Sequence, residues 1–195
     1  MGITIGLVGL GSFGRQFAEL FHSHPGVDRV MLCDRDEERM KSFAGKETWG
    51  PKLGAEGCYT DYAALLESGV DAVAIFTQPW LHAPQALRAL EAGASVYSAV
   101  PVIMVPDGDE IIDWCGKLCD AVKSTGKHYM LGETTYYRPS AMFCRRQAAA
   151  GAFGNFVHAE GEYFHDVDSA SNLRDVKRAR ESSASGLEWR EKIKT

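Results

Sequence analysis

The feature that most constrains this chain is a glycine turn between a short apolar run and an amphipathic segment. Ile3 to Gly9 is apolar and ends in glycine, which is typical of a buried parallel strand. Gly9, Gly11 and Gly14 then form the pattern G-x-G-x-x-G. Apolar residues at helical spacing follow over Ser12 to Ser23. Strand, glycine turn and helix in this order predict a parallel sheet that opens with an anion-binding turn.

An acidic residue follows at the spacing that is typical of a dinucleotide-binding turn. The second predicted strand, Val30 to Asp34, ends 20 residues beyond Gly14. A carboxylate there accepts hydrogen bonds from the adenosine ribose hydroxyls and repels the 2'-phosphate of NADP. Arg35 stands beside it and can offset that repulsion or stack on adenine. We therefore expect NAD, with NADP and a turn without any ligand as alternatives. The residues expected to bind the cofactor here are Gly9, Gly11, Ser12, Phe13, Gly14, Asp34 and Arg35.

Strands and helices continue to alternate as far as Glu133. Further strands are predicted at Asp71–Thr77, Ala94–Ser98 and His128–Glu133. Helices are predicted at Arg35–Lys46, from Thr60 or Asp61, at Trp80–Ala92, and from Asp107 to Gly126, with turns between Lys46 and Gly57. This alternation predicts an α/β, doubly wound parallel Rossmann sheet over residues 1–135.

The pattern changes after residue 135. A helix is predicted at Ser140–Ala150 and an alternating strand at Asn155–Phe164, which would present an exposed edge. From Asp166 to Thr195, 13 of 30 residues are charged, so this tail is either a solvated helix or disordered. We expect residues 136–195 to be the incomplete start of a truncated α+β C-terminal domain with a charged tail.

Composition excludes several classes of protein. The net charge of -5 does not provide the excess positive charge that binding to nucleic-acid phosphates requires. No apolar run approaches the roughly 18 residues that span a bilayer, and the N-terminus has no cationic region typical of a signal peptide. Cys115 and Cys119 share one helix face without further ligands at metal-site spacing. We expect a cytoplasmic protein with no metal and no nucleic-acid or membrane partner.

The chain resembles the Gfo/Idh/MocA family of NAD(P)-dependent oxidoreductases, which act mostly on sugars and cyclitols. The likeness covers Ile3 to about Asp166 and rests on GLVGLGSFG, DAVAIFTQPWLHAPQALRALEAGASVY and RPSAMFCRRQAAAGAFGNFVHAEGEY. The resemblance implies that Thr77, Gln78 and Pro79 line the nicotinamide ribose side of the cofactor cleft, with His82 beside them. The alternative for His82 is capping or packing on its own helix.

The sequence departs from the family in two respects. Where the family has Glu-Lys-Pro, with a lysine that assists proton transfer, this chain has Ala99-Val100-Pro101. Valine carries no proton, so that role is absent at this position. Family members are also usually much longer, with a C-terminal half that supplies catalytic residues and the dimer. We expect either a truncated piece or a short relative with lost or altered chemistry.

Polar residues after the sixth predicted strand are candidates to replace the lysine. Glu133 could serve as a base and Tyr136 could pass a proton, while Tyr137 and Arg138 could hold an anionic or polyol substrate. His165 belongs to a second polar cluster and is a further catalytic candidate. The alternatives are that Glu133 caps a helix, that the tyrosines cover a domain junction, and that the second cluster is the wet face of a strand.

These observations predict an NAD(P)-dependent oxidoreductase that moves a hydride between nicotinamide and a hydroxyl carbon of a sugar or polyol. A homo-oligomer is expected only if a full C-terminal domain exists. The alternative is a non-catalytic dinucleotide-binding module, either a redox sensor or a regulatory partner, which Val100 and the short length favour. A Rossmann protein for another nucleotide, such as an S-adenosyl compound, is a third alternative.

Overall fold

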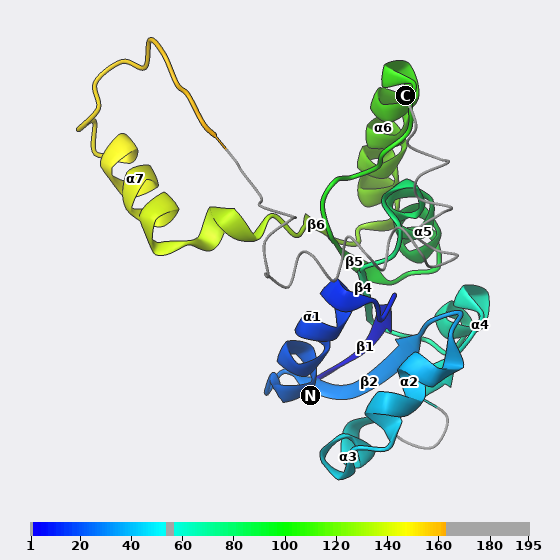
Figure 1. The fold of residues 1–195 in the computed structure, drawn as a ribbon. Coiled ribbons are helices and arrows are strands. Elements are labelled where there is room, and N and C mark those ends of the chain that lie inside the picture. Colours follow the sequence, from blue (N-terminus) through cyan, green and yellow to red (C-terminus); the bar gives the residue numbers. More distant parts are fainter. Residues whose placement is uncertain (1, 54–56, 163–195) are drawn as a thin grey trace, which may run out of the picture. The chain divides into compact units, whose positions relative to one another are not determined.

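A computed structural model describes residues 2–53 and 57–162 (Figure 1). The chain divides into two compact units, with the division after Gly132. The first unit holds the sheet, and the described part of the second is helical. His165 and the charged tail lie outside the described residues.

The first unit is built on one six-stranded sheet in which every pair of neighbours is parallel. Its spatial order is β3-β2-β1-β4-β5-β6, so the direction of winding reverses between β1 and β4. Ligands of such sheets bind outside the carboxyl ends of the strands at this reversal. The predicted doubly wound Rossmann sheet is confirmed. The strands are β1 (Ile3–Val8), β2 (Val27–Cys33), β3 (Cys58–Tyr59), β4 (Ala72–Ile75), β5 (Ser95–Ser98) and β6 (Tyr129–Leu131).

Helices cover both faces because parallel neighbours need crossover connections. Successive residues of β1 show this alternation, since Leu7 packs in one apolar cluster and Val8 in the other. Residues of α1, α2 and α3 pack with Leu7, and residues of α4, α5 and α6 pack with Val8. The helices are α1 (Ser12–Ser23), α2 (Glu37–Ala44), α3 (Gly50–Leu53), α4 (Tyr62–Glu67), α5 (His82–Glu91) and α6 (Gly108–Thr125), with 3₁₀ turns η1 (Glu47–Trp49) and η2 (Pro79–Leu81).

Local capping explains where the longest helix begins and ends. The Asp107 side chain accepts a hydrogen bond of 2.8 Å from the Asp109 N–H at the start of α6. Gly126 ends the helix with φ of 66°, a left-handed conformation that favours glycine. Both ends agree with the prediction from the sequence.

The segment predicted as turns between Lys46 and Gly57 is more regular than expected. It forms η1 and α3, and β3 begins directly after Gly57. The cause is Trp49, which is fully buried with its ring centroid 4.9 Å from that of Phe43 and 4.4 Å from that of His22. One large aromatic side chain therefore orders a stretch whose glycines and proline indicate only turns.

The second unit begins with a 3₁₀ turn, η3 (Thr134–Tyr137), followed by α7 (Pro139–Ala149). The prediction of a strand at Asn155–Phe164 is wrong for residues 155–162, which have no strand structure. Phe156 and Val157 are 69% and 96% exposed there. Within the described part of this unit no strand is available to pair with the segment, and alternation alone does not form a strand without a partner.

Candidate functional site

The turn between β1 and α1 is packed at two glycines and open at the third. Gly9 has φ of +89°, and a Cβ there would lie 2.8 Å from the backbone of Phe76. A Cβ at Gly14 would overlap the carbonyl oxygen of Gly9. A Cβ at Gly11, in contrast, would meet nothing within 4 Å. Gly9 and Gly14 therefore allow close packing of the backbone, and Gly11 borders open space.

The start of α1 has the features of an anion-binding helix end. Gly11 is the N-cap residue, and no side chain makes a capping hydrogen bond there. The first turn contains no acidic residue. Since the first N–H groups of a helix carry partial positive charge, the amides from Ser12 onward fit a pyrophosphate. Phe13 is 46% exposed in this turn, with its ring centroid 4.8 Å from that of Phe17.

Asp34 ties the end of β2 to the glycine turn. Its Oδ2 accepts a hydrogen bond of 2.7 Å from the Leu10 N–H, and its Oδ1 accepts one of 3.0 Å from the Asp36 N–H. A carboxylate has about four acceptor positions, so these two hydrogen bonds do not exhaust its capacity as an acceptor. The residue is 7% exposed and therefore largely buried. Arg35 follows directly and is exposed.

Arg39 belongs to the same corner of the site, and sequence reasoning missed it. Its Nη1 lies 3.6 Å from Asp34 Oδ2, and its Nε lies 3.2 Å from Asp36 Oδ2. The guanidinium therefore offsets part of the negative charge of Asp34. Asp36 and Arg39 have the i,i+3 spacing of an ion pair on a helix, and this spacing in the sequence could have indicated the contact.

The segment after β4 is held by hydrogen bonds to helix α5. The Thr77 hydroxyl donates to Gln85 Oε1 at 2.5 Å, so its proton is directed toward α5. Gln78 has extended backbone, and Pro79 begins η2. All three predicted residues, Thr77, Gln78 and Pro79, are half-buried at the carboxyl end of β4.

His82 is buried at the start of α5 and is 2% exposed. Its Nδ1 lies 2.8 Å from the Pro101 carbonyl oxygen, and its Nε2 lies 3.1 Å from that of Thr77. Burial lowers the pKa of the imidazole, although the carbonyl groups of Pro101, Thr77 and Ala99 oppose this effect. Any contribution of His82 to a ligand site passes through the backbone that it contacts.

The turn after β5 offers no proton donor or acceptor on its side chains. Ala99 is buried and Val100 is 42% exposed. Val100 stands at the position of the lysine in the family that the sequence resembles. Proton transfer from this turn is therefore not available to a bound substrate.

Four further residues that the sequence predicts as site candidates lie in the described part of the second unit: Glu133, Tyr136, Tyr137 and Arg138. The Glu133 side chain accepts a hydrogen bond of 2.8 Å from the Thr135 N–H and so caps η3, the alternative considered above. The Tyr136 ring packs edge-on against Tyr137, with centroids 4.9 Å apart. The Arg145 guanidinium, which sequence reasoning did not select, lies 3.8 Å from the centroid of Tyr136. Arg138 is exposed at the N-cap of α7.

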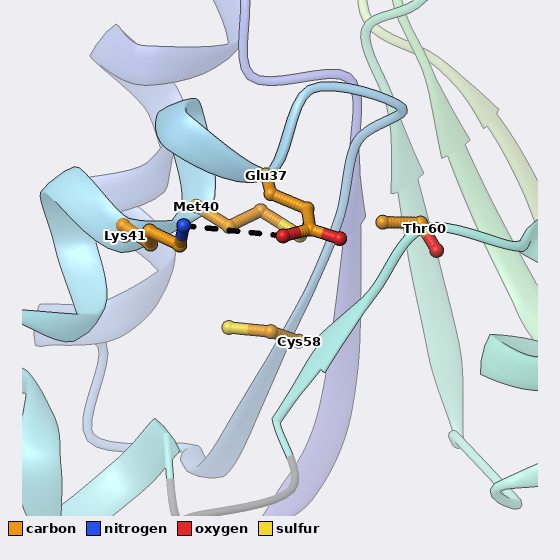
Figure 2. A pocket seen from close by; sticks show the side chains of 5 residues that line it. All are labelled: Glu37, Met40, Lys41, Cys58 and Thr60. Atoms are coloured by element: carbon orange, nitrogen blue, oxygen red, sulfur yellow. Dashed lines mark ion pairs between the residues drawn. The ribbon is translucent and has the colours of Figure 1, made fainter.

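A pocket of about 220 Å³ lies between α2 and β3, apart from the predicted site residues (Figure 2). Lys41 Nζ lies 3.9 Å from Glu37 Oε2 in an ion pair across its wall. Burial raises the pKa of the Cys58 thiol, which disfavours the reactive thiolate. The lining residues of the pocket are Glu37, Met40, Lys41, Cys58 and Thr60.

Within 2–53 and 57–162, no three or more His, Cys, Asp or Glu side chains cluster as metal ligands would. No helix in these ranges combines the length and apolar character needed to cross a membrane.

Comparison with known proteins places the first unit in a family. The family model described as "Oxidoreductase family, NAD-binding Rossmann fold" (GFO_IDH_MocA) matches residues 3–133. A glycosyl hydrolase family 109 protein of Streptomyces niveus is 35% identical over 173 residues, covering 85% of this chain and 33% of that protein. An alpha-N-acetylgalactosaminidase of Bacteroides fragilis is 28% identical over 174 residues, covering 86% and 39%. The chain thus spans little more than a third of the length of these relatives.

Solved structures show the same fold. Myo-inositol 2-dehydrogenase from Lactobacillus plantarum has a TM-score of 0.75 at 21% identity, covering 95% of this chain and 51% of that one. Scyllo-inositol dehydrogenase from Lactobacillus casei, with bound NAD(H) and scyllo-inositol, has a TM-score of 0.66 at 22% identity, covering 80% and 43%.

Proposed function

Because the chain belongs to the Gfo/Idh/MocA oxidoreductase family with its NAD-binding Rossmann fold, we propose that its first unit binds NAD(H) across the carboxyl ends of β1, β2 and β4. The observation that carries the proposal is the open space at Gly11 beside a helix end without a side-chain cap. A glycine there lets the phosphates approach the backbone, and the amides of Ser12 and Phe13 supply hydrogen-bond donors.

Each half of the cofactor has a set of residues that fits it. Asp34 would accept hydrogen bonds from the adenosine ribose, with Arg35 beside it. Thr77, Gln78 and Pro79 would border the nicotinamide half, because they follow β4 on the other side of the winding reversal. When bound, the nicotinamide supplies hydride transfer, while the protein supplies binding and orientation.

We infer NAD in preference to NADP from the charge of Asp34, which repels a 2'-phosphate. Arg39 offsets part of that charge, so the preference is smaller than an unpaired carboxylate would give. A small preference, rather than strict exclusion of NADP, is the expected behaviour.

For the substrate we propose a sugar or polyol. The structural neighbours are named for inositols, and one curated relative is named for N-acetylgalactosaminides. A dehydrogenase moves a hydride between nicotinamide and a hydroxyl carbon of its substrate. Most glycoside hydrolases use two carboxylates instead, but NAD-dependent glycoside hydrolases are a known exception. We propose turnover of this substrate only for a protein with the length of these relatives.

A second candidate function is a non-catalytic dinucleotide-binding module, and Val100 at the turn after β5 favours it. An enzyme needs an ionisable group beside the nicotinamide, and the side chains of Ala99, Val100 and Pro101 supply none. The two candidates share cofactor binding and differ in substrate turnover.

Titration of the chain with NADH, and separately with NADPH, tests the proposal. Energy transfer from the four tryptophans to the reduced nicotinamide reports binding. Saturable binding, tighter for NADH, is the expected result; binding of neither cofactor by the folded protein contradicts it.

With p-nitrophenyl N-acetyl-α-galactosaminide and NAD, release of nitrophenol without accumulation of NADH would identify hydrolysis. Accumulation of NADH with a polyol would identify a dehydrogenase. Cofactor binding without either reaction, in a protein with the length of these relatives, would favour the non-catalytic module.

A further inference from the structure

The imidazole of His82 joins two loops on the side of the sheet proposed for the nicotinamide half. The ring lies between the carbonyl oxygen of Thr77, which follows β4, and that of Pro101, which follows β5. Both ring nitrogens face backbone, and the side chain is almost fully buried. The residue is therefore placed to act on a ligand through these two loops, and its ring does not present a nitrogen to the site.

The two loops leave strands that are already neighbours. Ile75 and Ser98 are paired at the ends of β4 and β5, and the Ala99 N–H donates to the Ile75 carbonyl at 2.9 Å. Beyond this point the chain turns into η2 after β4 and into the loop that carries Val100 after β5. The contacts of His82 continue the connection beyond the last ladder hydrogen bond.

We propose that His82 is a positioning residue, which fixes the spacing between the Thr77 and Pro101 backbones and thereby shapes the space for the nicotinamide ring. This inference rests on the proposed function of the first unit. It assigns His82 an indirect role: Thr77, Gln78 and Pro79 contact the cofactor, and His82 holds their loop against the loop of Val100.

Three substitutions separate the contacts of the ring. A neutral imidazole has one N–H and donates to only one of two carbonyls at a time. In His82→Asn the amide nitrogen takes the place of Nδ1 and can reach Pro101; in His82→Gln it takes the place of Nε2 and can reach Thr77. His82→Phe keeps an aromatic ring in the buried space and has no donor.

The experiment compares NADH with ADP, which lacks both the nicotinamide ring and its ribose, by calorimetry on the full chain. His82→Phe should raise the Kd for NADH by about tenfold or more and leave the Kd for ADP within about twofold. His82→Asn or His82→Gln should recover part of the NADH affinity. General damage to the fold would weaken both ligands together.

Equal weakening of NADH and ADP, or an unchanged NADH affinity in folded His82→Phe, would overturn the proposal. If His82→Phe does not fold, the other two variants decide: a loss confined to NADH in either one supports the role, and no such loss overturns it. A wild-type chain that binds neither ligand would contradict the cofactor function itself, which is a distinguishable result.

Discussion

The carboxylate of Asp34 accepts a hydrogen bond of 2.7 Å from the backbone N–H of Leu10, which joins the end of β2 to the glycine turn after β1. Arg39 lies 3.6 Å from the same carboxylate oxygen. In the proposed site Asp34 therefore has two roles. It fixes the backbone of the turn, and it places negative charge at the adenosine end.

Replacing Asp34 with alanine should lower both the stability of the fold and its affinity for NADH. The variant leaves the Leu10 N–H buried without an acceptor, which costs about 1–3 kcal/mol of unfolding free energy. Urea unfolding and calorimetric titration measure the two effects. Asp107→Ala is the control, because it removes the cap of α6 at a cost of about 1 kcal/mol and should leave NADH affinity unchanged. Equal loss of NADH affinity in both variants would count against the assignment.

Arg39→Gln should weaken the binding of NADPH relative to that of NADH. Without the guanidinium of Arg39, less positive charge offsets the repulsion between Asp34 and the 2'-phosphate, so the ratio of the NADPH Kd to the NADH Kd should rise by roughly tenfold. Tryptophan energy transfer measures both constants. Lys41→Gln is the matched control, since Lys41 is exposed and pairs with Glu38 at 2.7 Å. An unchanged ratio in Arg39→Gln would show that Arg39 has no part in cofactor choice.

The buried thiol of Cys33 should make the fold sensitive to base. Burial, together with the charges of Asp34 and Asp61, raises the pKa of this thiol from 9.0 to about 12. Above pH 9 the unfolded chain loses a proton that the folded chain keeps, so the unfolding free energy falls as pH rises, by at most about 1.4 kcal/mol per pH unit. Urea unfolding at a series of pH values between about 8 and 10.5 measures the slope. Cys33→Ala should give a shallower slope, and identical slopes would disprove the assignment.

The parts of the fold that local chemistry determines could be predicted from the sequence. The glycine turn, α1, and both ends of α6 follow from short patterns whose physical reasons lie within a few residues of each other. The parallel sheet with helices on both faces follows from the alternation of strands and helices, because parallel neighbours need crossover connections.

The features that sequence reasoning missed depend on contacts between distant segments. Trp49 orders its segment by packing on Phe43 and His22, and β3 has only two residues, too few for a periodic signal. The two contacts of His82 join segments after different strands, which spacing along one helix does not reveal. The segment 155–162 has alternating residues but lacks a partner strand within the described part of its own unit.

The stability of the Gly11→Ala variant should match that of the wild type, in contrast to Gly14→Ala. A methyl group at Gly11 meets no atom within 4 Å, whereas one at Gly14 overlaps the carbonyl oxygen of Gly9. Alanine at Gly11 should therefore leave the unfolding free energy nearly unchanged, because the entropic gain from alanine is offset by its lower preference for the N-cap position. Gly14→Ala should lower it by about 1–3 kcal/mol. Urea unfolding of the two variants side by side checks the difference.

The most direct test of the central claim is the NADH titration of Gly11→Ala against the wild type. If the pyrophosphate lies on the backbone of the turn, the added methyl group fills its space, and the Kd for NADH should rise by about tenfold or more in a protein of unchanged stability. Equal NADH affinity in the two proteins would contradict binding at the glycine turn.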